Sequence, residues 1–253
     1  MNKTYLNYTQ NWQNLLDTRN VLEISNHLNS GFSFHIDRKE YEKMKAKNPN
    51  YVHYYFGIED GKFKILVIDD VSDKESAHDF VFEKELSNHI GELESREVLK
   101  CYQNLEVAPN ANQDYLLPLV EALNRSFRWK MFSHNWLSIK YKGLRSNERI
   151  YFPMIANPFE DLVGIFEPEE NGKTTKSDYA HHFFGLKRIK DREAKDENGL
   201  HYAVSKMSDY MIDIIVTNIT DSDNTKEYFA DRSCLCTDHK SYNKEKYSLL
   251  PDY

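Results

Sequence analysis

Y-V-H-Y-Y-F-G-I at residues 51–58 and Y-A-H-H-F-F-G-L at residues 179–186 are the two stretches that decide how this chain is built. Four of their eight positions are identical, and three more keep their chemical character. The similarity continues downstream, where an apolar run ends at Asp69 in the first copy and at Asn218 in the second. Internal similarity indicates architecture before any single motif does. We therefore expect a structural unit that occurs twice.

The first unit is expected to contain a strand, a helix and a two-stranded hairpin. Residues 32–36 alternate as a strand does, and Asp37 with Glu40 three residues later forms the pattern of a helix capping box. The two strands of the hairpin meet at residues 59–62, where Asp-Gly favours the positive φ angles of a tight turn.

The second unit repeats this order with a longer connection. Residues 150–155 read as a strand, and Asn157, Pro158 and Glu160 resemble a helix start with proline at the first helical position. A charged stretch at residues 187–209 interrupts the second hairpin, with Asn-Gly inside it as a turn signal.

These patterns predict an α+β fold, with antiparallel sheets formed by two divergent βαββ-like units and with helices packed on one side. We expect one globular body with the following segments: an N-terminal helical segment at 1–30, a first unit at 31–75, a helical connector plus strand at 76–148, a second unit at 149–222 and an irregular tail at 223–253. Further expected elements are one helix or two short helices at 7–28, helices at 38–47, 87–104 and 113–130, and strands at 80–82 and 136–141.

Composition narrows the class of protein. A hydrophobic content of 40% indicates a packed globular chain. The net charge of −7 disfavours general nucleic-acid binding. Three cysteines do not make a disulfide framework, and no apolar stretch reads as a signal or a membrane span. We expect a soluble cytoplasmic protein without a membrane partner, whose partner is a protein or a small molecule.

The repeated strand supplies the best candidate ligand-binding residues. Because side chains alternate along a strand, Tyr51 and His53 share one face, and Tyr179 and His181 share the matching face of the second copy. The functional interpretation of such faces is a pair of aromatic, hydrogen-bonding grooves, or one groove that both copies share. The favoured interpretation is a half-buried sheet face in which these residues only pack.

Two further motifs are weaker. Asp69, Asp70 and Asp73 spell D-D-x-x-D, a magnesium-binding pattern, but here they follow a strand and are expected to be solvated acids at its end. The expected position of these acids makes a metal site there the less favoured interpretation.

Near the C-terminus, Cys234, Cys236 and His239 offer sulfur and nitrogen ligands for zinc. This set lacks a fourth ligand, which would come from a remote residue, either Cys101, His181 or His182. Ordinary reduced cysteines are the favoured alternative, and no metal or other cofactor is expected.

The chain contains no phosphate-binding glycine loop and no nucleophile elbow. We therefore expect a binding or protein-interaction protein without nucleotide-binding motifs, and the sequence leaves its partner open. Two other classes stay open. One is a metal-dependent or acid–base hydrolase that uses His53 or His181 with nearby carboxylates, and the other is a structural zinc protein.

Overall fold

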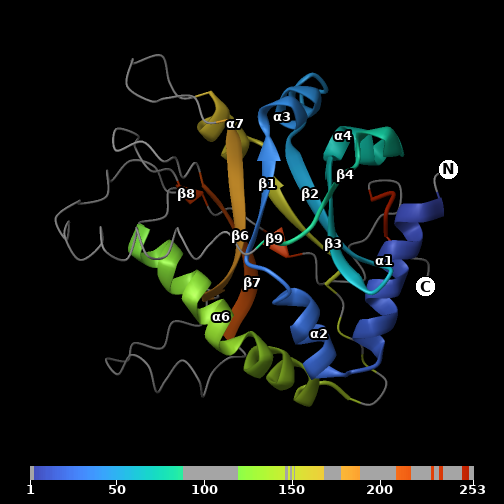
Figure 1. Ribbon diagram of the computed structural model, residues 1–253, viewed down its shortest axis with the longest axis vertical. Coiled ribbons are helices and arrows are strands. Elements are labelled where there is room, and N and C mark those ends of the chain that lie inside the picture. The colour runs from blue at the N-terminus through green and yellow to red at the C-terminus, as the bar shows by residue number, and fades with distance from the viewer. Residues whose placement is uncertain are drawn as a thin grey trace.

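The structure is a computed structural model that describes residues 3–87, 119–145, 148, 150, 152–167, 178–188, 209–217, 229–230, 234–235 and 247–250. Two antiparallel sheets pack face to face, and helices cover their outer faces (Figure 1). The helices are α1 (Lys3–Asp17), α2 (Val21–Leu28), α3 (Arg38–Lys45), α4 (Asp70–Lys74), the 3-10 turn η1 (His78–Phe80), α6 (Leu119–Lys142) and α7 (Glu160–Phe166). The strands are β1 (Ser33–Asp37), β2 (Tyr51–Glu59), β3 (Lys62–Asp69), β4 (Phe82–Lys84), β5 (Met154–Pro158), β6 (Tyr179–Arg188), β7 (Tyr210–Thr217), β8 (Phe229–Ala230) and β9 (Cys234–Leu235).

The expected α+β fold with antiparallel sheets is confirmed. One sheet has the order β1-β6-β7-β8, and the other has the order β4-β3-β2-β5-β9. The helices lie on both outer faces, where we expected one side, with α1 against β2 and α6 against β6. The reason is that both sheets turn one face inward to the core and the opposite face outward, so each has an outer face for a helix to cover.

The order strand, helix, strand, strand occurs twice, as β1-α3-β2-β3 and as β5-α7-β6-β7. The first strand of each series joins the hairpin of the other: β1 pairs with β6, and β5 pairs with β2. The two hairpins also have the same register, because Gly57 lies opposite Lys64 and Gly185 lies opposite Asp213. The division of the chain into a unit at 31–75 and a unit at 149–222 remains a prediction.

The core lies between the sheets and is built from matching positions of the two similar stretches. The rings of Phe56 and Phe184 meet with centroids 5.8 Å apart, and Tyr54 contacts His182 in the same layer. Aromatic pairs of this kind stabilise a core beyond the burial of their area. At one end of the sandwich, α3 packs against α7 through Tyr41, which stacks on Phe166 at 4.5 Å.

Two local predictions for the first unit are confirmed. Asp60 and Gly61 have φ angles of 48° and 76°, as a tight hairpin turn requires. Asp37 caps α3, and Glu40 bonds back to the cap, so the capping box is complete. The N-terminal segment forms two helices, α1 and α2.

Three local predictions are wrong. Residues 136–141 belong to the last part of α6, because the buried residues Trp129, Trp136 and Leu137 recur at helical spacing. The expected helix start at Asn157 and Pro158 is the end of β5, since the Asn157 side chain donates to the backbone oxygen of Ile214 and does not cap a helix.

The strand expected at 80–82 is also displaced, because η1 occupies its first residue and β4 begins at Phe82. The helix expected at 87–104 lies almost entirely outside the described residues, as does most of the tail. Among the described helices, none combines the length and the apolar character that crossing a membrane requires.

Candidate functional site

The predicted ligand-binding residues lie in two separate places. Tyr51 and His53 are on the outer face of the β2 sheet, whereas Tyr179 and His181 are on the outer face of the β6 sheet. The opposite face of each strand is in the core between the sheets. The two pairs therefore lie on opposite outer faces of the sandwich, and they do not line one common groove.

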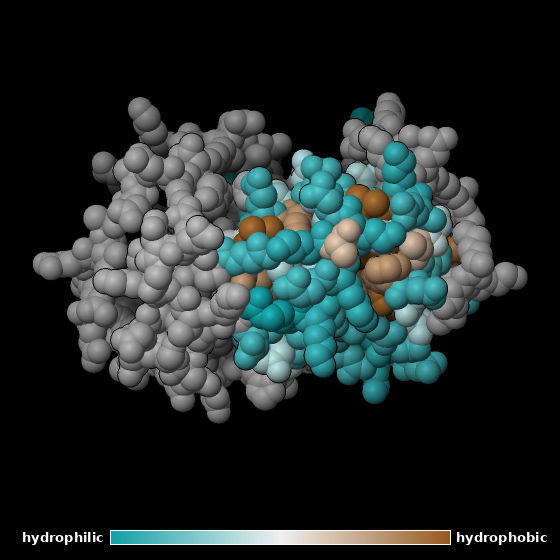
Figure 2. Space-filling view, turned by 90° about the horizontal axis from the view of Figure 1, so that it is seen from above, coloured by the Kyte–Doolittle hydropathy of each residue, from teal (hydrophilic) through white to brown (hydrophobic). Residues whose placement is uncertain are grey.

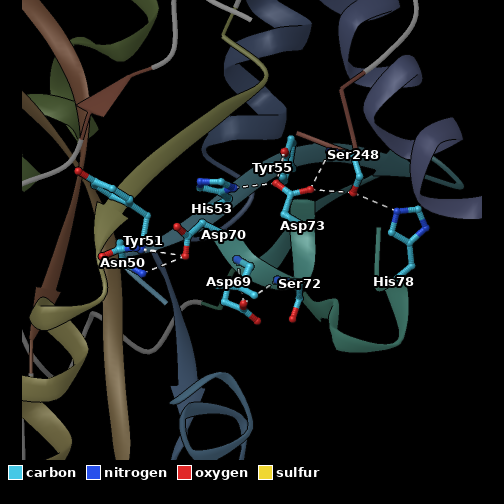
Figure 3. A network of polar contacts seen from close by, with 11 residues as sticks. Asn50, Tyr51, His53, Tyr55, Asp69, Asp70, Ser72, Asp73, His78 and Ser248 are labelled. Atoms are coloured by element: carbon cyan, nitrogen blue, oxygen red, sulfur yellow. Dashed lines mark hydrogen bonds and ion pairs between the residues drawn. The ribbon is translucent and has the colours of Figure 1, made fainter. Parts of the chain in front are cut away.

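His53 is held by a buried carboxylate. Its Nδ1 lies 2.7 Å from Oδ2 of Asp73, and the Asp73 side chain is fully buried (Figure 3). Because a carboxylate accepts, the imidazole donates from Nδ1, and this fixes the ring and leaves Nε2 as its basic nitrogen. Within the described residues, no hydrogen bond to Nε2 occurs. The ring of Tyr247 lies over His53 with centroids 5.1 Å apart.

Asp73 accepts three more hydrogen bonds. The hydroxyl of Tyr55 donates to the same Oδ2 at 2.5 Å, and both the backbone N–H and the hydroxyl of Ser248 donate to Oδ1 at 2.7 Å. His78 in turn lies 3.1 Å from the Ser248 hydroxyl through Nε2. These four donors satisfy both oxygens of the buried carboxylate. We call these residues the Asp73 network: His53, Tyr55, Asp73, His78 and Ser248.

The Asp73 network joins parts of the chain that are far apart in sequence. It connects β2, α4, η1 and the C-terminal segment 247–250 (Figure 3). The His78 ring has a second nitrogen, Nδ1, which is buried and has no hydrogen-bond partner among the described residues. The network therefore fastens the C-terminal segment to the β2 sheet and orients the imidazole of His53, which is itself buried.

The D-D-x-x-D acids are not the solvated residues that the sequence predicted. Asp69 and Asp73 are fully buried, and Asp69 caps α4 by accepting from the backbone of Val71 and Ser72. Asp70 accepts from the backbone N–H groups of Asn50 and Tyr51 at 3.0 and 3.2 Å. The expectation is wrong because the chain turns into a short helix directly after β3. Asp69 caps this helix, and donors from other segments bind Asp70 and Asp73.

The matching face on the β6 sheet carries a different group. His35 of β1 lies directly opposite His181 of β6, and their ring centroids are 6.2 Å apart. The ring of Tyr179 meets His35 edge to face at 5.1 Å. We call His35, Tyr179 and His181 the His35 patch. His35 is exposed and His181 is half-buried.

Thr217 of β7 continues this row, because it lies directly opposite His181 on the other side of β6. The Thr217 side chain is fully buried, and its hydroxyl has no hydrogen-bond partner among the described residues. Three polar side chains thus follow one another across β1, β6 and β7 on one sheet face.

His182 belongs to the core and not to a ligand site. Its Nδ1 donates to the backbone oxygen of Ala180 at 3.0 Å, and its Nε2 accepts from the hydroxyl of Tyr54 at 3.1 Å. Burial lowers the pKa of His182 to about 3 and raises the pKa of the Tyr54 phenol well above its ordinary value. The neutral imidazole therefore has both nitrogens satisfied, and His182 is unsuited as a zinc ligand.

The weaker metal candidates are mostly outside the described residues. Cys236, His239 and Cys101 fall there, and Cys234 is described only through its backbone in β9, opposite Ala156. In the part of the chain that the structure describes, no group of three or more histidine, cysteine, aspartate or glutamate side chains has the arrangement of a metal site.

Sequence reasoning does not identify Asp73, His35 or Ser248 as members of these two places. The D-D-x-x-D pattern predicts that Asp73 is solvated, and the sequence predicts His35 only as part of a strand. An alternating strand signal does place His35 on the outer face of its sheet, but its neighbour depends on the pairing of β1 with β6. Ser248 is 175 residues from Asp73, and no local pattern signals that contact.

Comparison of the chain with models of protein families, with curated proteins and with solved structures finds no match.

Proposed function

We propose that this protein binds a protein partner through the end of the sandwich that carries α3 and α7. The observation that carries this proposal is the matched exposure of two tyrosines, Tyr51 at 48% and Tyr179 at 47%. Both are the first residues of strands that are otherwise mostly buried. An exposed tyrosine offers a large apolar ring with a polar tip, which is why the residue is enriched at protein interfaces.

The two tyrosines lie at the same end of the molecule. Tyr51 pairs with Pro158, just before α7, and Tyr179 pairs with Asp37, the cap of α3. The described surface at this end is mostly hydrophilic, with small separate hydrophobic patches (Figure 2). A polar surface with a few aromatic contact points is typical of interfaces that form and separate, since isolated anchors carry most of the binding energy.

Site-specific photocrosslinking in cells that produce the protein tests the proposal. The photoreactive residue p-benzoylphenylalanine replaces Tyr51 or Tyr179, and Leu22, which is 62% exposed on α2, is the control position. We expect a discrete crosslinked protein from positions 51 and 179 and none from position 22. The double variant Tyr51→Ser/Tyr179→Ser is expected to retain roughly a tenth or less of the captured partner. Equal crosslinking from all three positions, or none, would contradict the proposal.

The oriented imidazole of His53 favours a second candidate function, acid–base hydrolysis. A histidine whose Nδ1 is bound by a carboxylate, here Asp73 at 2.7 Å, has the arrangement in which Nε2 transfers a proton. Assays of the full chain against p-nitrophenyl esters and phosphates test it, with His53→Gln as the inactivating variant. His134→Gln, at an exposed histidine of α6 outside the Asp73 network, is the matched control. Hydrolysis that His53→Gln leaves unchanged would reject this candidate.

A further inference from the structure

We infer that the His35 patch binds a divalent transition-metal ion, with His35 and His181 as its two protein ligands. The two histidines come from neighbouring antiparallel strands and lie directly opposite each other. Directly opposite residues of such a pair have Cβ atoms about 4.5–5.5 Å apart, so both side chains rise from one small area of the sheet.

The separation of the rings is close to that of two ligands of one ion. A zinc ion lies about 2.0–2.1 Å from an imidazole nitrogen, and hence about 3.2 Å from the centre of the ring. At the tetrahedral angle of a zinc site, two bound imidazoles therefore have centres about 5.2 Å apart. The centroids of His35 and His181 are 6.2 Å apart, which is wider than this by about 1 Å. Rotation about the side-chain bonds of the exposed His35 brings the two rings to the separation that the ion requires.

The chemistry of the ligands selects the class of ion. Neutral imidazole nitrogen suits Zn²⁺, Ni²⁺ and Cu²⁺, whereas Mg²⁺ and Ca²⁺ require oxygen ligands. Two protein ligands leave the remaining positions to water or to a bound anion, which makes an open site.

The surroundings of the pair restrict the ligands and set the side on which an ion lies. The Tyr179 ring, edge to face with His35 at 5.1 Å, limits the orientations of that imidazole. Thr217 lies opposite His181 on β7 and is fully buried, so the ion and its bound water lie on the side of the exposed His35.

This site shares Tyr179 with the proposed interaction surface, but neither of its two ligands is an anchor of that surface, and the experiment measures bound metal directly. The full chain, purified without a histidine tag and stripped of metal, is titrated calorimetrically with ZnCl₂ and separately with NiCl₂. We expect saturable binding of one ion, weakened by roughly tenfold or more in His35→Gln and in His181→Gln, because each removes one of two ligands. His134→Gln, at an exposed histidine of α6, is the matched control and is expected to bind like the wild type.

Two further readouts complete the test. Electron spin-echo modulation of bound Cu²⁺ reports imidazole nitrogens directly, and we expect two in the wild type and one in either variant. Circular dichroism of both variants verifies that the fold is retained, which is expected because the substituted side chains lie on an outer sheet face. Zinc binding that survives both substitutions would overturn the inference. So would zinc binding that is lost instead in Cys234→Ser/Cys236→Ser, since that result assigns the ion to the C-terminal thiols.

Discussion

Tyr54 and His182 occupy the same position in the two similar stretches, and in the folded protein they touch. The phenol donates to Nε2 of the imidazole at 3.1 Å, and the ring of Phe34 stacks on His182 at 4.7 Å. Only the neutral imidazole with its proton on Nδ1 satisfies both this bond and the bond to Ala180. A charged histidine at this place would be buried without an anionic partner, and this explains why its pKa falls to about 3.

The buried neutral state of His182 makes stability depend on pH. In the unfolded chain a histidine has a pKa of about 6.5, so between that value and about 3 the unfolded state binds the extra proton. Stability therefore falls as the pH falls below about 6.5, and this residue alone contributes a loss of about 1.4 kcal/mol between pH 7.5 and pH 5.5. We expect His182→Gln to lower stability at neutral pH but to show a smaller loss over this interval.

Urea unfolding of both proteins at the two pH values measures this difference. His134→Gln is the control, because an exposed histidine is expected to leave the pH dependence as in the wild type. An unchanged loss of stability in His182→Gln would mean that other groups cause the acid sensitivity.

At the scale of elements, each outer helix packs where a strand has glycine. A Cβ atom at Gly57 would lie 2.8 Å from Cβ of Tyr8 in α1, and one at Gly185 would lie 3.0 Å from Cβ of Arg125 in α6. The residues opposite these glycines carry buried charges that are paired. Lys64 bonds Glu85 at 2.7 Å, and Asp213 bonds Arg125 at 2.9 Å. On both sheets, the outer helix thus packs closely against the strand at a glycine.

The closeness of these contacts predicts unequal effects of added methyl groups. We expect Gly57→Ala to lower the free energy of unfolding by about 1–3 kcal/mol, because the added Cβ atom would clash with Cβ of Tyr8 unless α1 shifts. Gly185→Ala is expected to cost less, since its neighbours need to move only a few tenths of an ångström. Gly143→Ala, whose Cβ would have no neighbour nearer than 3.6 Å, is the control. Equal denaturation midpoints for Gly57→Ala and Gly143→Ala would show that α1 does not pack closely on β2.

Elements that depend on neighbouring residues were predictable from the sequence. The turn at Asp60 and Gly61 and the capping box at Asp37 and Glu40 are local, because both partners of each interaction lie within three residues. The register of the first hairpin follows from the same tight turn, which places Glu59 opposite Lys62. The strand predicted at residues 136–141 is wrong, because an alternating pattern over only six residues does not distinguish a strand from one face of a helix.

The candidate sites were less predictable, because their partners are distant in sequence. Which face of β2 and β6 carries tyrosine and histidine follows from alternation, but what covers that face does not. Asp73 is part of α4, and the position of this helix brings its carboxylate to His53. The same carboxylate accepts from Ser248, which is 175 residues away in the sequence. His35 meets His181 only because β1 crosses to the other hairpin.

That crossing determines how the whole molecule holds together. The first strand of each series is hydrogen-bonded to the hairpin of the other, as β1 to β6 and β5 to β2. The aromatic layer of Phe56 and Phe184 is likewise divided between the two halves of the chain. Neither half therefore contains a complete sheet or a complete core, although each contains its own hairpin.

The exchange of strands predicts that neither half folds alone. We expect the fragments 1–100 and 101–253 to lack cooperative thermal unfolding when each is purified by itself, because the first loses β5 from its sheet and the second loses β1. When mixed, the two should associate and regain the amide NMR spectrum of the intact chain, since every strand then finds its partner. Gly57→Ala in the first fragment should weaken this association, because it disturbs the packing of α1 on β2. A dispersed spectrum and a cooperative transition for fragment 1–100 alone would show instead that the first unit is an independent domain, and the pairing of β1 with β6 would then be a contact between two preformed bodies.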